Sequence, residues 1–308
     1  MESAAPARSL AVRSPAAQSP AAQSPAAQSP AAQPQPALSR RHEAGAGSAR
    51  GILFTLLGEF VLPDGGAAWT SAVLAAFERL GVAEKATRQA LMRTSNAGWI
   101  SAEKVGRRTR WLLTPAATKL LTDGARRIYS FGPARAWDGH WVLVQVRIPE
   151  TDRRARHVVR TRLAWAGFGS LGPGLWISPH ADREQEAVRV LREAGVASDA
   201  HVFTAQRTGL SDTREMVAAA WDLPEIEAEY EQFVAEFRAP GRPVDVLLRQ
   251  LEMVHAWRRF PALDPALPQE LLPPRWSGTR AAELFSDRHE RWADDARREW
   301  QRLNTDPS

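Results

Sequence analysis

Hydrophobic residues between positions 52 and 61 recur with the period of an amphipathic helix. The residues on this face are Ile52, Leu53, Leu56, Leu57, Phe60 and Val61. The turn-forming sequence PDGG at 63–66 follows, and a second helix is predicted from about Thr70 to a stop at Gly81. Its buried side is expected to hold Val73, Leu74, Phe77 and Leu80. Two short helices joined by a turn are therefore predicted to begin the ordered part of the chain.

The segment 81–100, GVAEKATRQALMRTSNAGWI, predicts a third helix whose faces differ in chemistry. At about 100° per residue its alanines fall in one arc, and we expect them to face the preceding helices. These alanines are Ala83, Ala86, Ala90 and Ala97. The opposite side carries Lys85, Arg88, Gln89 and Met92, with Arg93 at the flank. From 84 to 111 there are seven basic residues but two acidic ones, Glu84 and Glu103, and this excess indicates an anionic partner.

Two alternating segments, 99–104 and 108–114, predict a hairpin whose turn lies at Val105, Gly106 and Arg107. Three helices followed by a hairpin with a basic tip are the element order of a winged helix-turn-helix. The third helix of that fold enters the major groove of DNA, where Arg pairs with guanine and Gln with adenine. We therefore expect base reading by Lys85, Arg88 and Gln89, and contact with the DNA backbone by Arg93, Lys104, Arg107, Arg108 and Arg110. The alternative is a winged module used for protein contact, as in an adaptor.

The hydrophobic pattern changes beyond residue 137. A strand at 140–148 precedes a basic helix whose apolar contacts are expected at Val158, Leu163 and Trp165. Two short strands around a Gly-Pro-Gly turn follow, then a helix with Val188 and Leu191 inward, and a last strand, HVFTAQ. The order βαββαβ predicts a ferredoxin-like domain.

The last third of the chain is helical and aromatic. Its expected core positions are Trp221, Leu223, Ile226, Tyr230, Phe233 and Phe237 in one segment and Val246, Leu247, Leu251 and Val254 in the next. His255, Arg258 and Arg259 gather near a helix end, just before FPALDPALP, among the aromatic residues Trp257, Phe260 and Trp276. Two interpretations remain open: the arginines cap a helix end and the prolines fix a turn, or the group binds a phosphate-bearing ligand.

The expected fold class is α+β and multidomain. Residues 1–47 contain SPAAQ four times in tandem and too few apolar residues for a core, which predicts a disordered Ser/Pro/Ala/Gln tail. The expected parts that follow are a winged helix-turn-helix domain at 48–122, a linker helix at 123–136, a ferredoxin-like domain at 137–207 and a mostly helical C-terminal domain at 208–304.

Composition limits the functions that the chain can have. Forty Lys and Arg against 35 Asp and Glu give a net charge of +5, and there is no cysteine, which excludes disulfides and thiolate metal sites. The apolar runs are far shorter than the ~20 residues of a membrane span, so we expect no membrane partner and a cytoplasmic protein. Ser178, His180 and Asp182 lie close together but lack a nucleophile elbow, the histidines lack metal-ligand spacing, and no phosphate-binding glycine motif occurs. No catalytic residue, metal or cofactor is expected.

Three long strings together resemble the PaaX family of bacterial transcriptional regulators. They are WDGHWVLVQVRIPE, LAWAGFGSLGPGLWISPH and HAWRRFPALDPALPQELLPPRW, and the likeness covers about residues 48–295. The resemblance implies a winged-helix DNA reader, a central domain similar to the small CRISPR-adaptation nuclease, and a helical C-terminal domain. It also implies a nucleoid-associated homodimer that binds a double-stranded operator and represses phenylacetate or related aromatic catabolism. An aryl-acetyl-coenzyme A thioester, phenylacetyl-CoA or a relative, is then the expected effector, with His255, Trp257, Arg258 and Arg259 as candidate contacts.

The resemblance to a nuclease raises one alternative function, metal-dependent DNA cleavage by the central domain. The nuclease holds its metal with an aspartate near the end of its first strand, and aligning VQVRIP on that strand places Arg147 there. A cation at that position repels Mg²⁺. Asp138 and Asp152 lie near the two ends of the strand but show no paired geometry in the sequence. The expected protein is therefore a regulator without catalytic activity.

Overall fold

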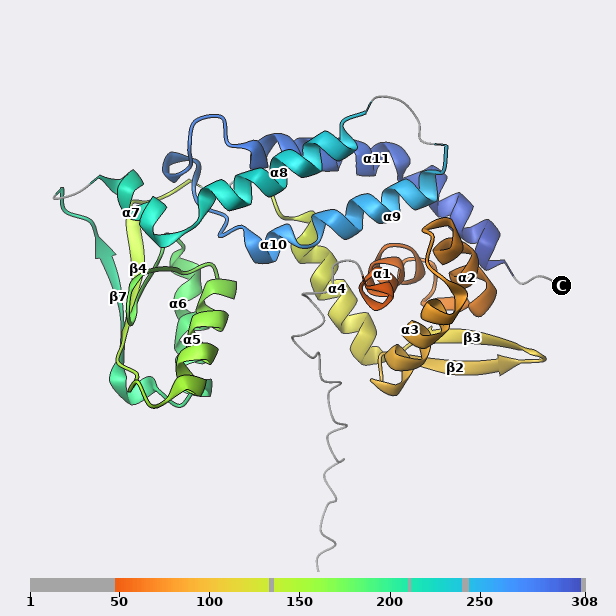
Figure 1. Cartoon of the computed structure of the whole chain (residues 1–308), viewed down its shortest axis with the longest axis horizontal. Helices are drawn as coiled ribbons and strands as arrows, with labels where there is room; N and C mark the ends of the chain where they lie inside the picture. The colour runs from red at the N-terminus through yellow and green to blue at the C-terminus, as the bar shows by residue number, and fades with distance from the viewer. Residues whose placement is uncertain (1–47, 133–135, 210–211, 240–243, 306–308) are drawn as a thin grey trace, which may run out of the picture. The chain divides into compact units, whose positions relative to one another are not determined.

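The first three helices form as the hydrophobic pattern predicts (Figure 1). The computed structural model describes residues 48–132, 136–209, 212–239 and 244–305, so the predicted tail 1–47 lies outside the described residues. Helix α1 (Ala49–Leu56) begins at Ser48, whose side chain accepts a hydrogen bond from the Gly51 amide at 3.1 Å. The chain continues through the π-helical turn η2 (Leu57–Val61) to α2 (Thr70–Arg79) and α3 (Glu84–Asn96).

A three-stranded sheet accompanies these helices. Strands β2 (Ile100–Val105) and β3 (Arg108–Leu113) form the predicted hairpin, and β1 (Ala67–Trp69) pairs with β3, giving the order β1-β3-β2. The sequence pattern did not predict β1, because three residues are too few to show an alternation. Helix α4 (Pro115–Tyr129) follows and runs without a break through residues 122 and 123.

The central part of the chain is a four-stranded antiparallel sheet with two helices on one face (Figure 1). Its elements appear in the predicted order and the strands lie in the order β5-β6-β4-β7. They are β4 (His140–Val146), α5 (Arg153–Trp165), β5 (Gly169–Gly172), β6 (Leu175–Ser178), the turn η3 (Ala181–Arg183), α6 (Glu184–Glu193), the turn η4 (Ala197–Asp199) and β7 (Ala200–Gln206). Val142, Val144, Val159, Leu163 and Leu191 belong to a core of its own between the sheet and the helices.

One prediction for α5 is wrong. Trp165, expected among the inward contacts, is 42% exposed, whereas Leu163 is fully buried. Residues two positions apart in a helix differ by about 200° around its axis, so the side chains of Leu163 and Trp165 cannot lie on the same face. Val159 is the buried valine of this helix, and Val158 is half-buried.

The C-terminal part is helical, as predicted. It contains α7 (Thr213–Ala220), α8 (Leu223–Phe237), α9 (Val246–Trp257), α10 (Phe260–Leu263), the turn η5 (Gln269–Leu271) and α11 (Ser277–Asn304). In Figure 1 the long α11 runs along α8 and α9. The predicted core residues of both segments are buried, except that Ile226 is half-buried. Among the described residues no helix is long and apolar enough to cross a membrane.

A single hydrophobic core joins the first helices to the last ones. Phe60 and Trp300, 240 positions apart, lie with ring centroids 6.2 Å apart in this core. The Asn304 side chain accepts from the Trp69 amide and donates to the Ala67 carbonyl, both at 2.9 Å, and so holds the end of α11 on β1. The C-terminal helices are therefore packed directly against the N-terminal ones.

Candidate functional site

Helix α3 presents one buried face and one exposed basic face. Lys85, Arg88, Gln89, Met92 and Arg93 are exposed, as the helical wheel predicts for the first four. The opposite face buries Thr87, Ala90, Leu91 and Thr94. The expected alanine arc is thus wrong in part: Ala90 is buried, but Ala83 is exposed and Ala86 and Ala97 are half-buried. Ala83 precedes the helix as its N-cap, and its carbonyl accepts from the Thr87 hydroxyl at 3.3 Å, which allows that hydroxyl to be buried.

Arg88, one of the exposed cations of α3, has a weakly bound partner. Arg88 donates through Nε to Glu84 Oε1 at 2.7 Å, with both side chains more than half exposed. Exposed ion pairs of this kind contribute about 0 to 1 kcal/mol. A base or phosphate can therefore take the place of Glu84 at little cost.

The hairpin tip carries further exposed cations. Lys104, Arg107 and Arg108 are exposed around Gly106, whose φ of 60° suits glycine at the turn. Arg110 differs, because Glu103 lies opposite it on β2 and accepts from its Nε and Nη2 at 2.9 and 2.7 Å. The Arg110 guanidinium also lies 5.7 Å from the ring centroid of Trp69. The tip is thus exposed, whereas Arg110 is held within the sheet.

The four candidate effector residues do not line one site. Trp257 is fully buried, stacks on Phe285 with centroids 4.7 Å apart, and donates to the Ile128 carbonyl at 3.2 Å. Arg259 pairs with Glu229. His255 Nδ1 lies 2.7 Å from the hydroxyl oxygen of Thr55 on α1, which also accepts from Arg258.

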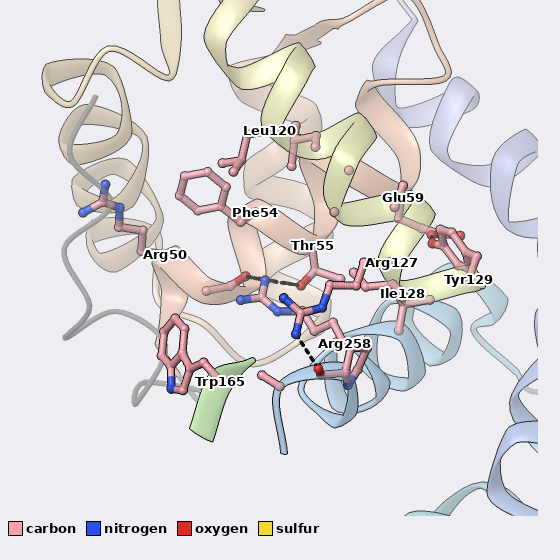
Figure 2. Close-up of a pocket in the computed structure, with 18 residues that line it drawn as sticks. Arg50, Phe54, Thr55, Glu59, Leu120, Arg127, Ile128, Tyr129, Trp165 and Arg258 are labelled. Atoms are coloured by element: carbon pink, nitrogen blue, oxygen red, sulfur yellow. Dashed lines mark hydrogen bonds between the residues drawn. The ribbon is translucent and has the colours of Figure 1, made fainter. Parts of the chain in front are cut away.

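Arg258 does line a pocket, which lies between α1, α4 and the junction of α9 and α10 (Figure 2). Its volume is about 420 Å³. Apolar side chains, among them Phe54, Leu120 and Trp165, share its walls with Arg50, Arg127 and Arg258. We name it the arginine pocket. Sequence reasoning missed it because its lining comes from four separated segments; the one available signal was Trp165, which lies off the buried face of its helix.

Main-chain carbonyls hold two of these arginines. Arg258 Nη1 donates to the Gly51 carbonyl at 3.0 Å and to Thr55 Oγ1 at 3.1 Å, and Arg127 Nη2 donates to the Pro261 carbonyl at 2.6 Å. These bonds fix the positions of the guanidinium groups but do not neutralise their charge. The pocket therefore combines guanidinium groups with apolar walls.

Among the described residues that line the pocket, Glu59 is the one carboxylate, and three side chains already contact it. It accepts from Gln250 Nε2 at 2.6 Å, from the Tyr129 hydroxyl, and from His289, whose Nε2 is 2.8 Å away. Burial raises the pKa of Glu59, but hydrogen bonds and the His289 charge outweigh it, so the pKa lies below its ordinary value. Burial and the neighbouring Glu59 carboxylate raise the pKa of Tyr129. Glu59 is thus an ionised group that other partners engage.

A second group of cations surrounds the end of β4. Arg147 follows that strand and lines an open groove of about 640 Å³ with Arg153, Arg156, His157 and Arg160. Asp138 accepts from the His140 amide and Asp152 from the Ala155 amide, each at 2.9 Å, so both carboxylates have local roles. Within the described part of the chain, no group of three or more His, Cys, Asp or Glu is placed to hold a metal.

The potential Ser, His and Asp group at 178–182 is likewise explained by local bonds. The buried Ser178 hydroxyl accepts from the His180 amide at 3.3 Å. His180 Nε2 lies 3.2 Å from the Pro265 carbonyl, and burial followed by the charge of Arg183 lowers its pKa. The arrangement fastens β6 to the Pro265 loop.

Three family models match consecutive stretches of the chain. They are described as a PaaX-like protein at 48–117, the PaaX protein central Cas2-like domain at 134–217, and the PaaX-like protein C-terminal domain at 221–302. The transcriptional repressor PaaX of Escherichia coli (strain K12) is 32% identical over an alignment of 262 residues, and the match covers 80% of this chain and 81% of that protein. Among solved structures, the uncharacterized protein Rv0674 from Mycobacterium tuberculosis is similar with a TM-score of 0.60. That match covers 82% of this chain and 99% of the other at 22% identity, a likeness of fold alone.

Proposed function

Because the chain belongs to the PaaX family of transcriptional regulators, we propose that it is a sequence-specific DNA-binding repressor of phenylacetate or related aromatic catabolic genes. The family models together reach from residue 48 to residue 302, and the similar protein from Escherichia coli is named a transcriptional repressor. The observation that carries the proposal is the face of α3, where Lys85, Arg88 and Gln89 are exposed together on a helix whose other side is packed.

In the proposed complex the segment 48–122 acts as a winged helix-turn-helix. Helix α3 enters the major groove, where Arg88 forks onto a guanine and Gln89 onto an adenine. Lys104, Arg107 and Arg108 at the hairpin tip contact phosphate, with Arg93 at the flank of the helix. Arg110 was also predicted to contact the backbone, and its bonds to Glu103 make it the weakest of these candidates.

The rest of the chain is proposed to carry dimerisation and effector response. The sheet order β5-β6-β4-β7 with α5 and α6 on one face supports a ferredoxin-like domain at 137–207. The helical segment 208–304 completes the regulator, and the linker segment 123–136 begins within α4. The effector is an aryl-acetyl-CoA thioester, and the protein acts as a homodimer in the cytoplasm on a double-stranded operator.

No catalytic step is proposed. The alternative, a metal-dependent nuclease in the central domain, requires carboxylates at the end of β4, where the structure has Arg147 and its basic neighbours. Incubation with Mg²⁺ or Mn²⁺ and a labelled duplex is expected to leave the duplex intact. Cleavage that EDTA abolishes, and that replacement of Asp138 or Asp152 also abolishes, would establish the nuclease instead.

Footprinting of the purified protein on DNA upstream of its own gene tests the proposed function. We expect a protected stretch that disappears when one member of a panel of aryl-CoA thioesters is added. A footprint that no thioester removes contradicts the proposed effector. Selection from random duplexes is the companion measurement, since the absence of any enriched sequence would favour an adaptor that uses the winged module for protein contact.

A further inference from the structure

We infer that the arginine pocket binds an anionic ligand with a planar apolar end and transmits its presence to α3. The inference rests on the proposed function in one respect: it takes the ligand to be the aryl-CoA thioester. Of the four residues predicted from the sequence as effector contacts, Arg258 lines this pocket. Arg127, Trp165 and Phe54 also line it and come from other parts of the chain.

The apolar walls of the pocket suit a planar apolar group at one end of the ligand. Trp165 is 42% exposed at the end of α5 and borders the pocket together with the half-buried Phe54 and Leu120. Large exposed aromatic surfaces beside a cavity are typical of binding sites, because a ligand removes them from water. A volume of about 420 Å³ is within the range of small-molecule pockets.

The charges account for the anionic part. Among the described residues, three arginines and one carboxylate line the pocket, and that carboxylate is engaged by His289, Gln250 and Tyr129. A guanidinium has five N–H donors, so the bond from Arg127 to Pro261 leaves it able to donate to a phosphate or carbonyl oxygen of the ligand. In Figure 2 the Arg127 and Arg258 side chains reach the middle of the view, with Arg50 to one side.

One ring contact and one electrostatic interaction relate the pocket to α3, the helix proposed to read DNA. The Phe54 ring meets Trp99, between α3 and β2, edge to face, with centroids 6.0 Å apart and an interplanar angle of 78°. Burial, followed by the positive charge of Arg93 on α3, lowers the pKa of Arg50, so Arg50 lies within electrostatic reach of that helix. A ligand that favours one arrangement of Phe54 and Arg50 thereby favours one position of α3.

Gly124 allows the pocket to be filled without disturbing the fold. It lies within α4 and lines the pocket, and a Cβ built there meets nothing within 4 Å. We therefore expect Gly124→Ala to fold with an unchanged or higher Tm, since glycine is unfavourable inside a helix. Gly124→Leu keeps the helix and places a branched side chain in the cavity. Gly124→Ala is its matched control, because the pocket stays open.

A second pair of variants tests the charge. Arg127→Gln removes a lining cation, whereas Arg126→Gln removes the adjacent arginine of α4, which is 74% exposed and pairs with Asp123 outside the pocket. Calorimetric titration with phenylacetyl-CoA should give equal affinities for the wild type, Gly124→Ala and Arg126→Gln. Gly124→Leu and Arg127→Gln should bind about tenfold more weakly or worse. Equal thioester affinities in all five proteins would show that the thioester does not bind in the arginine pocket.

Anilinonaphthalene sulfonate, an aromatic anion unrelated to the effector, separates failure of the pocket from failure of the proposed function. Its fluorescence should rise on the wild type and on Gly124→Ala, fall on Gly124→Leu, and be displaced by phenylacetyl-CoA. Fluorescence that Gly124→Leu abolishes but the thioester does not displace would uphold the pocket and contradict the proposed effector. Equal fluorescence on the wild type and Gly124→Leu would contradict the pocket itself.

Discussion

Two arginine-rich regions of the molecule differ in how they hold their cations. On α3 and the hairpin tip the cations, among them Lys85, Arg88 and Arg107, are exposed, and Arg88 has a solvent-exposed partner. In the arginine pocket, main-chain carbonyl oxygens hold Arg127, which is also exposed, and the half-buried Arg258 beside apolar walls. The exposed cations suit a polyanion that arrives from solvent and is sensitive to salt, whereas the fixed ones suit a small anion of defined shape. We therefore propose that the same residue type serves two recognition tasks, and that its surroundings decide which.

The largest expected effect is the loss of DNA affinity when Arg88 on α3 is replaced. Arg88→Ala should cost about 1 to 3 kcal/mol of binding free energy on the preferred duplex and relax the preference at one base pair, because the proposed bidentate contact to guanine is lost. Anisotropy titrations against the preferred duplex and its single-base variants measure both. Arg126→Ala removes an exposed arginine from α4 and serves as the control, expected to bind like the wild type. An equal loss on every duplex would assign Arg88 to the backbone.

The next largest expected effect is a pH-dependent loss of stability when Glu59, the carboxylate that lines the arginine pocket, is replaced. The folded pKa of Glu59 lies below its ordinary value of 4.5, so its ionised form contributes stability above that pH, and the contribution is lost as the pH falls through the folded pKa. Glu59→Gln should lower the free energy of unfolding at pH 7 by about 1.5 kcal/mol, the lower end of the range for one hydrogen bond to a charged group. The Tm difference between wild type and variant should shrink as the pH falls below 4.5. A difference that stays constant from neutral to acid pH would exclude a role for the Glu59 charge.

The smallest expected effect is a change in the salt dependence of DNA affinity, which distinguishes the hairpin tip from α3. Arg107→Ala should weaken all duplexes alike and reduce the slope of log affinity against log salt by about one unit, because one phosphate contact is lost. Between about 50 and 200 mM salt the wild type should then lose roughly 0.7 kcal/mol more than the variant. Arg110→Ala is the informative partner, since its guanidinium is engaged by Glu103 and should change the slope less. Equal slopes for wild type and Arg107→Ala would remove the tip from the interface.

Local periodicity predicted most of the elements but not how they share cores. The helices and the βαββαβ order depend on neighbours within a few residues. The predictions from this local pattern are confirmed for α1, α2 and α3 and for the order of the central elements. The common core of the first and last helices, fastened by Asn304 on β1, depends on packing between residues about 235 positions apart. No local pattern contains that information.

The two sites were predictable to different degrees for the same reason. The exposed face of α3 follows from a single helix, so the outward positions of Lys85, Arg88 and Gln89 could be read from spacing. The alanine arc failed because Thr87 satisfies its hydroxyl within the helix and can be buried. The arginine pocket depends on how α1, α4, α5 and α9 meet, and its members had no common sequence signal.

The division of labour between the two regions is tested most directly by measuring two affinities for each of two variants, Arg88→Ala and Arg127→Gln. One is the affinity for the preferred duplex without thioester, and the other is the affinity for phenylacetyl-CoA without DNA. We expect Arg88→Ala to lose DNA affinity and keep thioester affinity, and Arg127→Gln to do the reverse. Loss of both affinities in each variant, or loss of duplex affinity in Arg127→Gln alone, would contradict two separate sites.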